Sequence, residues 1–210
     1  MNSRNVKAGG LVLLLSLGLS ACAPVMLAGF AGTAMVASDR RTSGTQLEDE
    51  TIELRGSARV RDALGERAHV NITSYNRQVL LSGEVATERD KQIVEGLLEK
   101  LENVKTVVNE VSIMQPTSLS SRSNDLLLTA KVKAALVDSR DLFANAFKIV
   151  AERGTVYVMG RVTQREATSA TNVIRNVNGV NKVVRLFEII SEDELRNLLP
   201  PPPVEDKGKK

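Results

Sequence analysis

An internal repeat restricts this chain to two small modules of the same kind. Residues 79–85 read VLLSGEV, and residues 156–162 read VYVMGRV at an offset of 77 residues. Two further pairs occur in the same order along the chain: ARVRDAL at 58–64 with AKVKAAL at 130–136, and VKTVVN at 104–109 with VNKVVR at 180–185. Three matched segments at a nearly constant offset indicate a duplication, in which each copy is one supersecondary unit.

Each copy is predicted to fold as helix, strand, strand, helix, strand. In copy one, residues 70–75 and 79–85 alternate between apolar and polar residues, as paired strands do. The turn between them is Asn76-Arg77, and copy two has Arg153-Gly154 there, where glycine suits the positive φ of a tight hairpin. The last strands are expected at 105–113 and 181–190. The fold class is therefore α+β, with two helices on a three-stranded sheet in each module.

The second helices begin with helix-capping sequences. Thr163 to Glu166 form a capping box in copy two, and Thr87 to Asp90 form a weaker version in copy one. Copy one also carries Gly56 inside its first helix, where we expect the glycine to shorten or kink that helix.

The repeat also divides the chain. The polar, helix-breaking residues between the copies are interpreted as a linker, and the proline-rich, charged C-terminus as a tail whose last part, 199–210, is unpacked. The predicted boundaries are a signal peptide at 1–21, an acylated N-terminus and tether at 22–45, a first module at 46–114, a linker at 115–122, a second module at 123–191 and a tail at 192–210.

One face of each sheet is expected to face the helices of its own module. In copy one, Val79, Leu81 and Val85 lie on that face, and Leu80 lies on the other. In copy two the outer face carries Tyr157 and Met159. Two alternatives follow: these outer side chains pack against the other copy, or they remain exposed as scattered apolar residues.

The N-terminus is typical of a secretory signal. Arg4 and Lys7 precede an apolar run at 10–19, and small residues precede Cys22. Residues 19–22, LSAC, resemble the bacterial lipobox, which implies a diacylglycerol and an N-acyl chain such as palmitate on Cys22. Cys22 is the only cysteine, so a disulfide within the chain is excluded. Alanine instead of aspartate after Cys22 implies sorting to the outer membrane, with the folded part in the periplasm.

The repeated pattern resembles the BON-domain family. The residues that carry the resemblance are the Val-x-Leu/Val-x-Gly-x-Val strands with Gly83 and Gly160, and the segments that begin at Val104 and Val180. The resemblance extends over roughly residues 49–190. Together with the lipobox, it implies a dual-BON outer-membrane lipoprotein that binds phospholipid through its second module, supports outer-membrane integrity and acts at the division site. It implies binding and no catalysis.

The residue inventory agrees with a protein that is not an enzyme. The single histidine, His69, lies at the start of a predicted strand and is expected to be a surface or loop residue. No spacing of histidine, cysteine and acidic residues suggests a metal site, and no phosphate-binding loop occurs. No cofactor besides the acyl chains, and no small-molecule substrate, is expected. The formal net charge of +3 falls to +1 without Arg4 and Lys7, which argues against a nucleic-acid partner.

The first helix of copy two has more apolar surface than its core requires. Leu128, Val132 and Leu136 lie on the core face, as do their counterparts in copy one. Copy two has a second apolar face, whereas copy one has Arg55 and Asp62 at the positions of Leu127 and Ala134. A helix that is apolar beyond one stripe has a second partner.

The loop that follows this helix is five residues longer in copy two. Apolar residues beside cations suit an anionic membrane surface of the phosphatidylglycerol type. The predicted phospholipid-contact residues are Leu126, Leu127, Ala130, Lys131, Lys133, Ala134, Val137, Arg140, Leu142 and Phe143. Two alternatives stay open for this face: packing against copy one, or a protein partner, which would make the chain an adaptor of an envelope assembly or quality-control machine. A hydrolase of envelope polymers is disfavoured, because no acid, base or nucleophile cluster is present.

Overall fold

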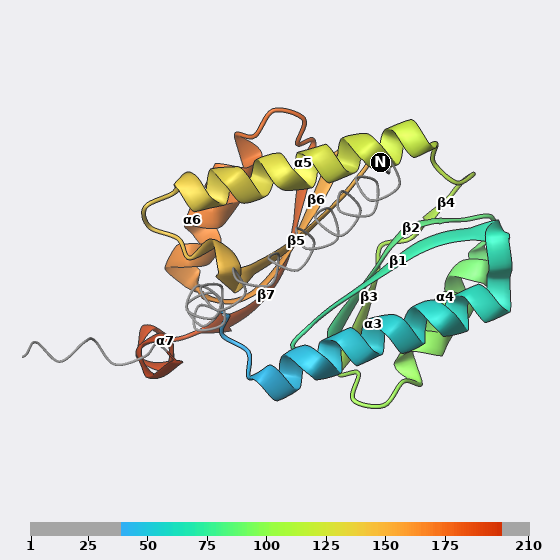
Figure 1. Ribbon diagram of the computed structural model, residues 1–210, viewed down its shortest axis with the longest axis horizontal. Helices are drawn as coiled ribbons and strands as arrows, with labels where there is room; N and C mark the ends of the chain where they lie inside the picture. Colours follow the sequence, from blue (N-terminus) through green and yellow to red (C-terminus); the bar gives the residue numbers. More distant parts are fainter. Residues whose placement is uncertain (1–38, 199–210) are drawn as a thin grey trace, which may run out of the picture. The chain divides into compact units, whose positions relative to one another are not determined.

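The computed structural model describes residues 39–198, so Cys22, most of the predicted tether and residues 199–210 lie outside the described residues. The α-β-β-α-β order predicted for each copy is confirmed (Figure 1). The first module consists of α3 (Ser43–Leu64), β1 (Ala68–Tyr75), β2 (Gln78–Val85), α4 (Glu88–Glu99), β3 (Thr106–Asn109) and β4 (Ser112–Ile113). The second module consists of α5 (Leu119–Asp138), β5 (Phe147–Glu152), β6 (Thr155–Thr163), α6 (Gln164–Arg175) and β7 (Lys182–Ile190), followed by α7 (Glu192–Leu198).

Both sheets have the same topology. β2 pairs antiparallel with β1 and parallel with β3 and β4, and β6 pairs antiparallel with β5 and parallel with β7. The last strand of the first module is interrupted, although one strand was expected at 105–113. At the break, Asn109 Oδ1 accepts a hydrogen bond from the Val111 backbone nitrogen at 3.2 Å, and Asn109 Nδ2 donates to the Lys91 carbonyl. This side chain bonds to backbone groups at the point where the ladder is interrupted.

The two predicted hairpin turns are confirmed. Asn76, Arg77, Arg153 and Gly154 all have positive φ values, as a tight two-residue turn requires. A carboxylate from the first helix of each module binds the turn. Asp49 accepts from the backbone nitrogens of Asn76 and Arg77 at 2.8 Å each, and Asp125 of α5 accepts from that of Gly154.

The predicted helix caps are confirmed, but the prediction that Gly56 shortens or kinks the first helix is wrong. Thr163 and Glu166 form the full capping box of α6, and Thr87 caps α4. Helix α3 continues through Gly56, where a Cβ atom would lie 2.7 Å from Leu98 Cδ1. The glycine therefore allows α3 to approach α4 closely, and the burial gained there offsets its low helix propensity.

The outer faces of the two sheets pack against each other. Tyr75 and Leu80 of the first module form one buried cluster with Tyr157 and Met159 of the second. In Figure 1 the sheets lie between α3 and α4 on one side and α5 and α6 on the other. Of the two alternatives for the outer face, packing between the copies is therefore the one that the molecule adopts.

Two helices occupy residues that were expected to be irregular. Helix α5 begins at Leu119, with the Ser118 hydroxyl as its cap, so half of the predicted linker is helical. Helix α7 forms the start of the predicted tail: its Leu195 is buried, and Glu194 pairs with Arg161 of β6. The burial of one leucine and an ion pair fixes this last turn against the second module.

Candidate functional site

Helix α5 carries the exposed apolar face that the sequence predicts. Leu126, Leu127 and Val137 are 72%, 61% and 68% exposed, while Leu128, Val132 and Leu136 are buried in the core of the second module. Ala130, Lys131, Lys133 and Ala134 are exposed as well. We call this set the α5 face: Leu126, Leu127, Ala130, Lys131, Lys133, Ala134 and Val137. Apart from Leu126, which also lines a cavity between the modules, the face is open to solvent and does not pack against copy one.

The loop after α5 contributes one exposed aromatic side chain and one exposed cation. Phe143 is 52% exposed, and Arg140 is also exposed. Leu142, in contrast, is only 8% exposed and belongs to the core cluster of the second module. Its prediction as a contact residue is therefore wrong. A short 3-10 turn at Ala144–Ala146 follows, and Leu142 and Ala146 pack together into this core.

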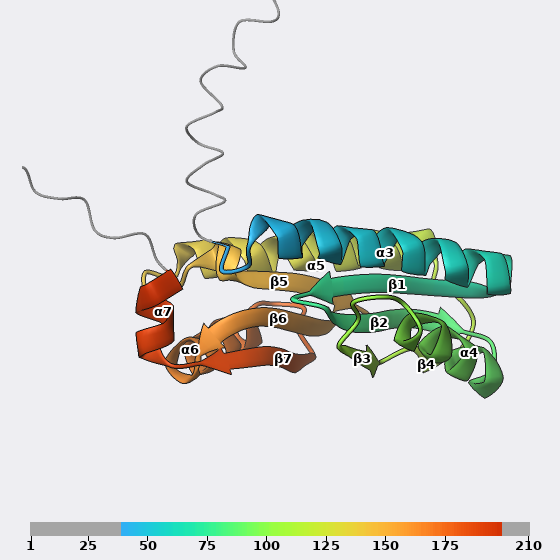
Figure 2. The same ribbon diagram turned by 90° about the horizontal axis from the view of Figure 1, so that it is seen from below.

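The first helix of copy one also exposes leucines, which the sequence comparison missed. Leu47 and Leu54 are 66% and 73% exposed, and they correspond to Leu119 and Leu126 at the repeat offset of 72. The comparison began at Arg55 and so did not reach them. Figure 2 shows α3 and α5 running along the same edge of the two sheets, the edge formed by β1 and β5. The features particular to copy two are therefore Leu127, Val137 and Phe143.

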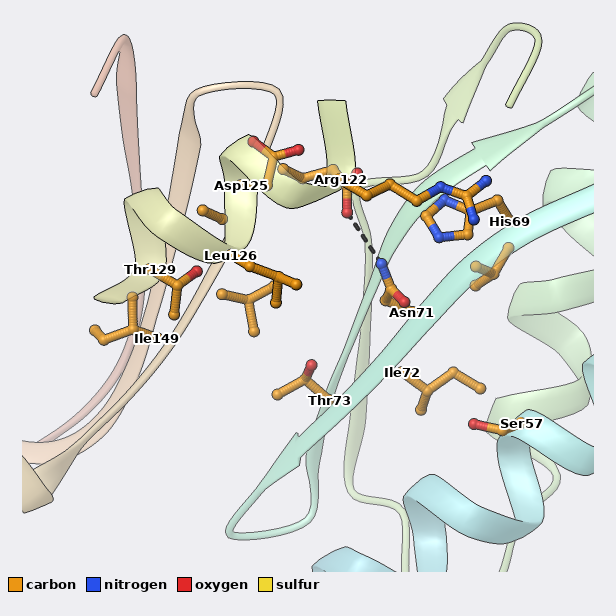
Figure 3. Close-up of a pocket in the computed structure, with 14 residues that line it drawn as sticks. Ser57, His69, Asn71, Ile72, Thr73, Arg122, Asp125, Leu126, Thr129 and Ile149 are labelled. Carbon is orange, nitrogen blue, oxygen red and sulfur yellow. Dashed lines mark hydrogen bonds between the residues drawn. The ribbon is translucent and has the colours of Figure 1, made fainter. Parts of the chain in front are cut away.

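A cavity of about 450 Å³ opens between the two modules, beside the α5 face (Figure 3). Its walls come from α3, β1, α5 and β5, and they combine apolar side chains such as Ile72, Leu126 and Ile149 with polar ones. Across the cavity Asn71 Nδ2 donates to Glu152 Oε2 at 3.1 Å. The cavity thus lies next to polar contacts that join the two modules.

His69 lies inside β1 and not in a loop. Its side chain is 20% exposed, and its Nδ1 atom is 2.9 Å from Oε2 of Glu84, a fully buried carboxylate of β2. Glu84 Oε1 also forms an ion pair with Arg153 Nη1 of the second module, at 2.9 Å.

A second buried carboxylate, Glu152, lies near His69 and Glu84. Burial raises the pKa of Glu152 above its ordinary value, although the hydrogen bond from Asn71 opposes this. Sequence reasoning missed the group of His69, Glu84 and Glu152 because its members are far apart along the chain.

Among residues 39–198, none of the helices has both the length and the apolar character that crossing a bilayer requires. Residues 54–115 and 124–191 each match the BON domain.

Two relatives share most of their length with this chain. The outer membrane lipoprotein DolP of Haemophilus influenzae is 34% identical over 174 residues, which are 82% of this chain and 90% of that protein. A 21 kDa hemolysin of Actinobacillus pleuropneumoniae is 32% identical over 72% of this chain and 79% of its own length. Among solved structures, CdsD of the Chlamydia trachomatis type III secretion system matches 73% of this chain and 96% of its own, with 15% identity and a TM-score of 0.30.

Proposed function

This chain belongs to the BON-domain family, and we propose that it is a lipoprotein of the outer membrane that binds anionic phospholipid through its second module. Cys22 would carry a diacylglycerol and an N-acyl chain, and the folded part would face the periplasm. The protein would support outer-membrane integrity, with a role at the division site. The name of the Haemophilus relative supports the location, and the LSAC sequence at 19–22 supports the acylation.

The observation that carries the lipid proposal is the α5 face, which is apolar, exposed and bordered by Lys131 and Lys133. Within the described residues neither lysine forms an ion pair, so both are available to phosphate groups. Arg140 in the loop lies close in sequence to two acidic residues, Asp138 and Asp141. The three cations, Arg140 and the two lysines, therefore exceed the two carboxylates by one, and this end of the helix has a net charge of +1. Apolar side chains would enter the acyl boundary while the cations met the headgroups.

The expected affinity of the face alone is modest. Each cation near an anionic surface is worth on the order of 1 kcal/mol, and an apolar side chain that is fully buried about 1.5–3 kcal/mol. Partial insertion of three or four side chains gives a few kcal/mol, which corresponds to weak binding by the free protein. An acyl anchor on the same chain would raise the effective concentration of the face at the bilayer, so weak binding suffices.

Co-sedimentation with vesicles tests this proposal. Both cores consist of residues between Ile52 and Ile190, so a chain of residues 23–210, without the signal peptide and the acylated cysteine, retains them. We expect this chain to bind phosphatidylglycerol vesicles better than phosphatidylcholine vesicles, and less well as salt rises. Leu127→Glu and Phe143→Glu should each weaken binding about tenfold. Ile189→Glu, at an exposed apolar position of β7, is the control and should bind like the parent.

Equal binding by Leu127→Glu, Phe143→Glu and the parent would refute lipid contact by the α5 face. A single dominant protein crosslink from this face in cells, unchanged by lipid composition, would instead favour an adaptor.

A further inference from the structure

Three potential metal ligands converge where the two modules meet. They are His69 of β1, Glu84 of β2 and Glu152 of β5, and one ligand atom from each lies within 4.8 Å of the others. His69 and Glu84 are direct cross-strand partners in the β1–β2 ladder, which fixes their side chains on one sheet face. Glu152 is the last residue of β5, directly before the β5–β6 turn, and comes from the other module. Imidazole nitrogens and carboxylate oxygens are both ligand types that Zn²⁺ takes, and catalytic zinc sites combine three protein ligands with a water molecule.

The carboxylates are buried and oriented by neighbouring groups. Glu84 is fully buried and Glu152 is 4% exposed. Arg153 and the Thr117 backbone nitrogen hold Glu84, and Asn71 holds Glu152. Such outer contacts, which fix the rotamer of each ligand, are typical of metal sites.

The charge of the surroundings suits a cation. The carboxylates of Glu84, Glu152 and Asp125 outnumber the guanidinium groups of Arg122 and Arg153 by one, so the group is negative when His69 is neutral. Burying that charge without a counter-ion is costly. A divalent cation would change the net charge of the group from −1 to +1 and would pair directly with the buried carboxylates of Glu84 and Glu152.

Two of the three ligands, His69 and Glu152, line the cavity between the modules, which offers a path for a metal and space for a water ligand, while Glu84 lies buried behind them. Figure 3 shows His69, Asn71, Arg122 and Asp125 around it. Asp125 is 8% exposed, and its Oδ2 atom has no hydrogen-bond partner among the described residues. A buried carboxylate oxygen without a partner is rare in folded proteins, and a water molecule in the cavity that Asp125 lines would satisfy it.

We propose that His69, Glu84 and Glu152 form a Zn²⁺ site that bridges the two modules, with a water molecule as the fourth ligand. Tetrahedral zinc places its ligand atoms about 3.4 Å apart. The His69 Nδ1–Glu84 Oε2 distance of 2.9 Å is close to this value, and Glu152 offers a ligand atom within 4.8 Å of the other two, so its side chain must move inward to complete the site. Binding through Nδ1 selects the imidazole tautomer with hydrogen on Nε2. Mg²⁺ and Ca²⁺ suit the site poorly because they prefer six or more oxygen ligands.

An occupied site would join the modules at a second point, besides the cluster of Tyr75, Leu80, Tyr157 and Met159. Because the metal would bind only the docked arrangement, zinc should raise the melting temperature in proportion to the logarithm of its concentration. This inference is independent of the proposed lipid contact, since none of its three ligands belongs to the α5 face.

The test uses the mature lipoprotein in detergent, without a histidine tag, and Zn²⁺ as the added ion. We expect one bound zinc per chain by equilibrium dialysis and metal analysis. His69→Gln and Glu152→Gln should each weaken binding at least tenfold, whereas Glu99→Gln, at an exposed carboxylate of α4, should not. Mg²⁺ and Ca²⁺ should not compete. Because the chain has one histidine, NMR of its imidazole nitrogens reports directly on the site, and zinc should shift Nδ1 more than Nε2.

Zinc that binds equally well to His69→Gln, or that leaves the imidazole resonances of the parent unchanged, would overturn the proposal, as would an absence of stoichiometric binding. Circular dichroism establishes that each variant is folded. If His69→Gln does not fold, Glu152→Gln and the imidazole shifts of the parent protein decide the question.

Discussion

Arg40 forms a two-pronged ion pair with Glu166 at the start of α6, with Nη1–Oε2 and Nη2–Oε1 distances of 2.8 and 2.6 Å. Both side chains are almost fully buried. Arg40 precedes the first module in sequence and yet binds the second, and it also donates to the Arg161 carbonyl. The segment that leads from the N-terminus is therefore fixed to the second module before α3 begins.

Removal of one partner from this pair should strongly destabilise the protein. Arg40→Ala leaves the Glu166 carboxylate buried without its counter-ion, and such losses cost about 3–5 kcal/mol. The matched control is Arg165→Ala, which breaks an exposed pair with Glu192 and should cost less than about 1 kcal/mol. Urea unfolding at pH 7 measures both. Similar losses in the two variants would contradict a special role for Arg40.

The same pair predicts a dependence of stability on pH. Although burial opposes it, the hydrogen bonds from Arg40 and from the Thr163 backbone lower the pKa of Glu166 below its ordinary value of 4.5. A lowered carboxyl pKa contributes stability that is present above pH 4.5 and is lost as the pH falls through the folded-state value. Between pH 5 and pH 3 the parent should therefore lose more stability than Glu166→Gln, as measured by thermal unfolding. Parallel curves would show that Glu166 does not contribute.

Gly56 and Gly96 offer a paired test of helix packing. A Cβ at Gly56 would meet Leu98 Cδ1 at 2.7 Å, whereas a Cβ at Gly96 of α4 would meet nothing within 4 Å. Gly56→Ala should destabilise by about 1–3 kcal/mol through overpacking. Gly96→Ala should stabilise by about 0.5–1 kcal/mol through helix propensity. Chemical denaturation of both variants provides the comparison, and stabilisation by Gly56→Ala would show that α3 does not need this close approach.

The packing between the sheets can be tested at Leu80. This side chain is fully buried in the cluster with Tyr157 and Met159, so Leu80→Ala should cost about 2–5 kcal/mol. Leu47→Ala, at an exposed position of α3, should cost well under 1 kcal/mol. If Leu80→Ala were as mild as Leu47→Ala, the two sheets would not pack against each other in solution.

The sequence was sufficient for features that depend on neighbouring residues. The hairpin at Asn76-Arg77 and the capping box at Thr163 follow from local backbone chemistry, and the repeat identified which helix positions are buried. Whether the Leu142 side chain faces the core or the solvent could not be derived, because an irregular loop has no periodicity that would indicate the buried positions. The start of α5 at Leu119 was missed because Ser118 is an N-cap within a polar run that also suits a linker.

Long-range relationships between residues were not predictable from one sequence. His69, Glu84 and Glu152 come together only because the β1–β2 hairpin and the end of β5 meet across the two modules. The pair of Arg40 and Glu166 spans 126 residues and leaves no local pattern. For Tyr157 and Met159 the strand alternation identified the outer face, but not what covers it.

The most direct test of the central claim compares two equivalent positions, Leu127 of α5 and Arg55 of α3. If Cys22 is acylated, the mature protein has no free thiol, so a cysteine introduced at either position can be labelled alone with an environment-sensitive fluorophore. In phosphatidylglycerol vesicles we predict that the label at 127 shifts to shorter wavelength and is quenched by lipids brominated in their acyl chains, while the label at 55 stays in water. In phosphatidylcholine vesicles the label at 127 should be quenched much less. A label at 127 that remains in water in phosphatidylglycerol vesicles would contradict the account.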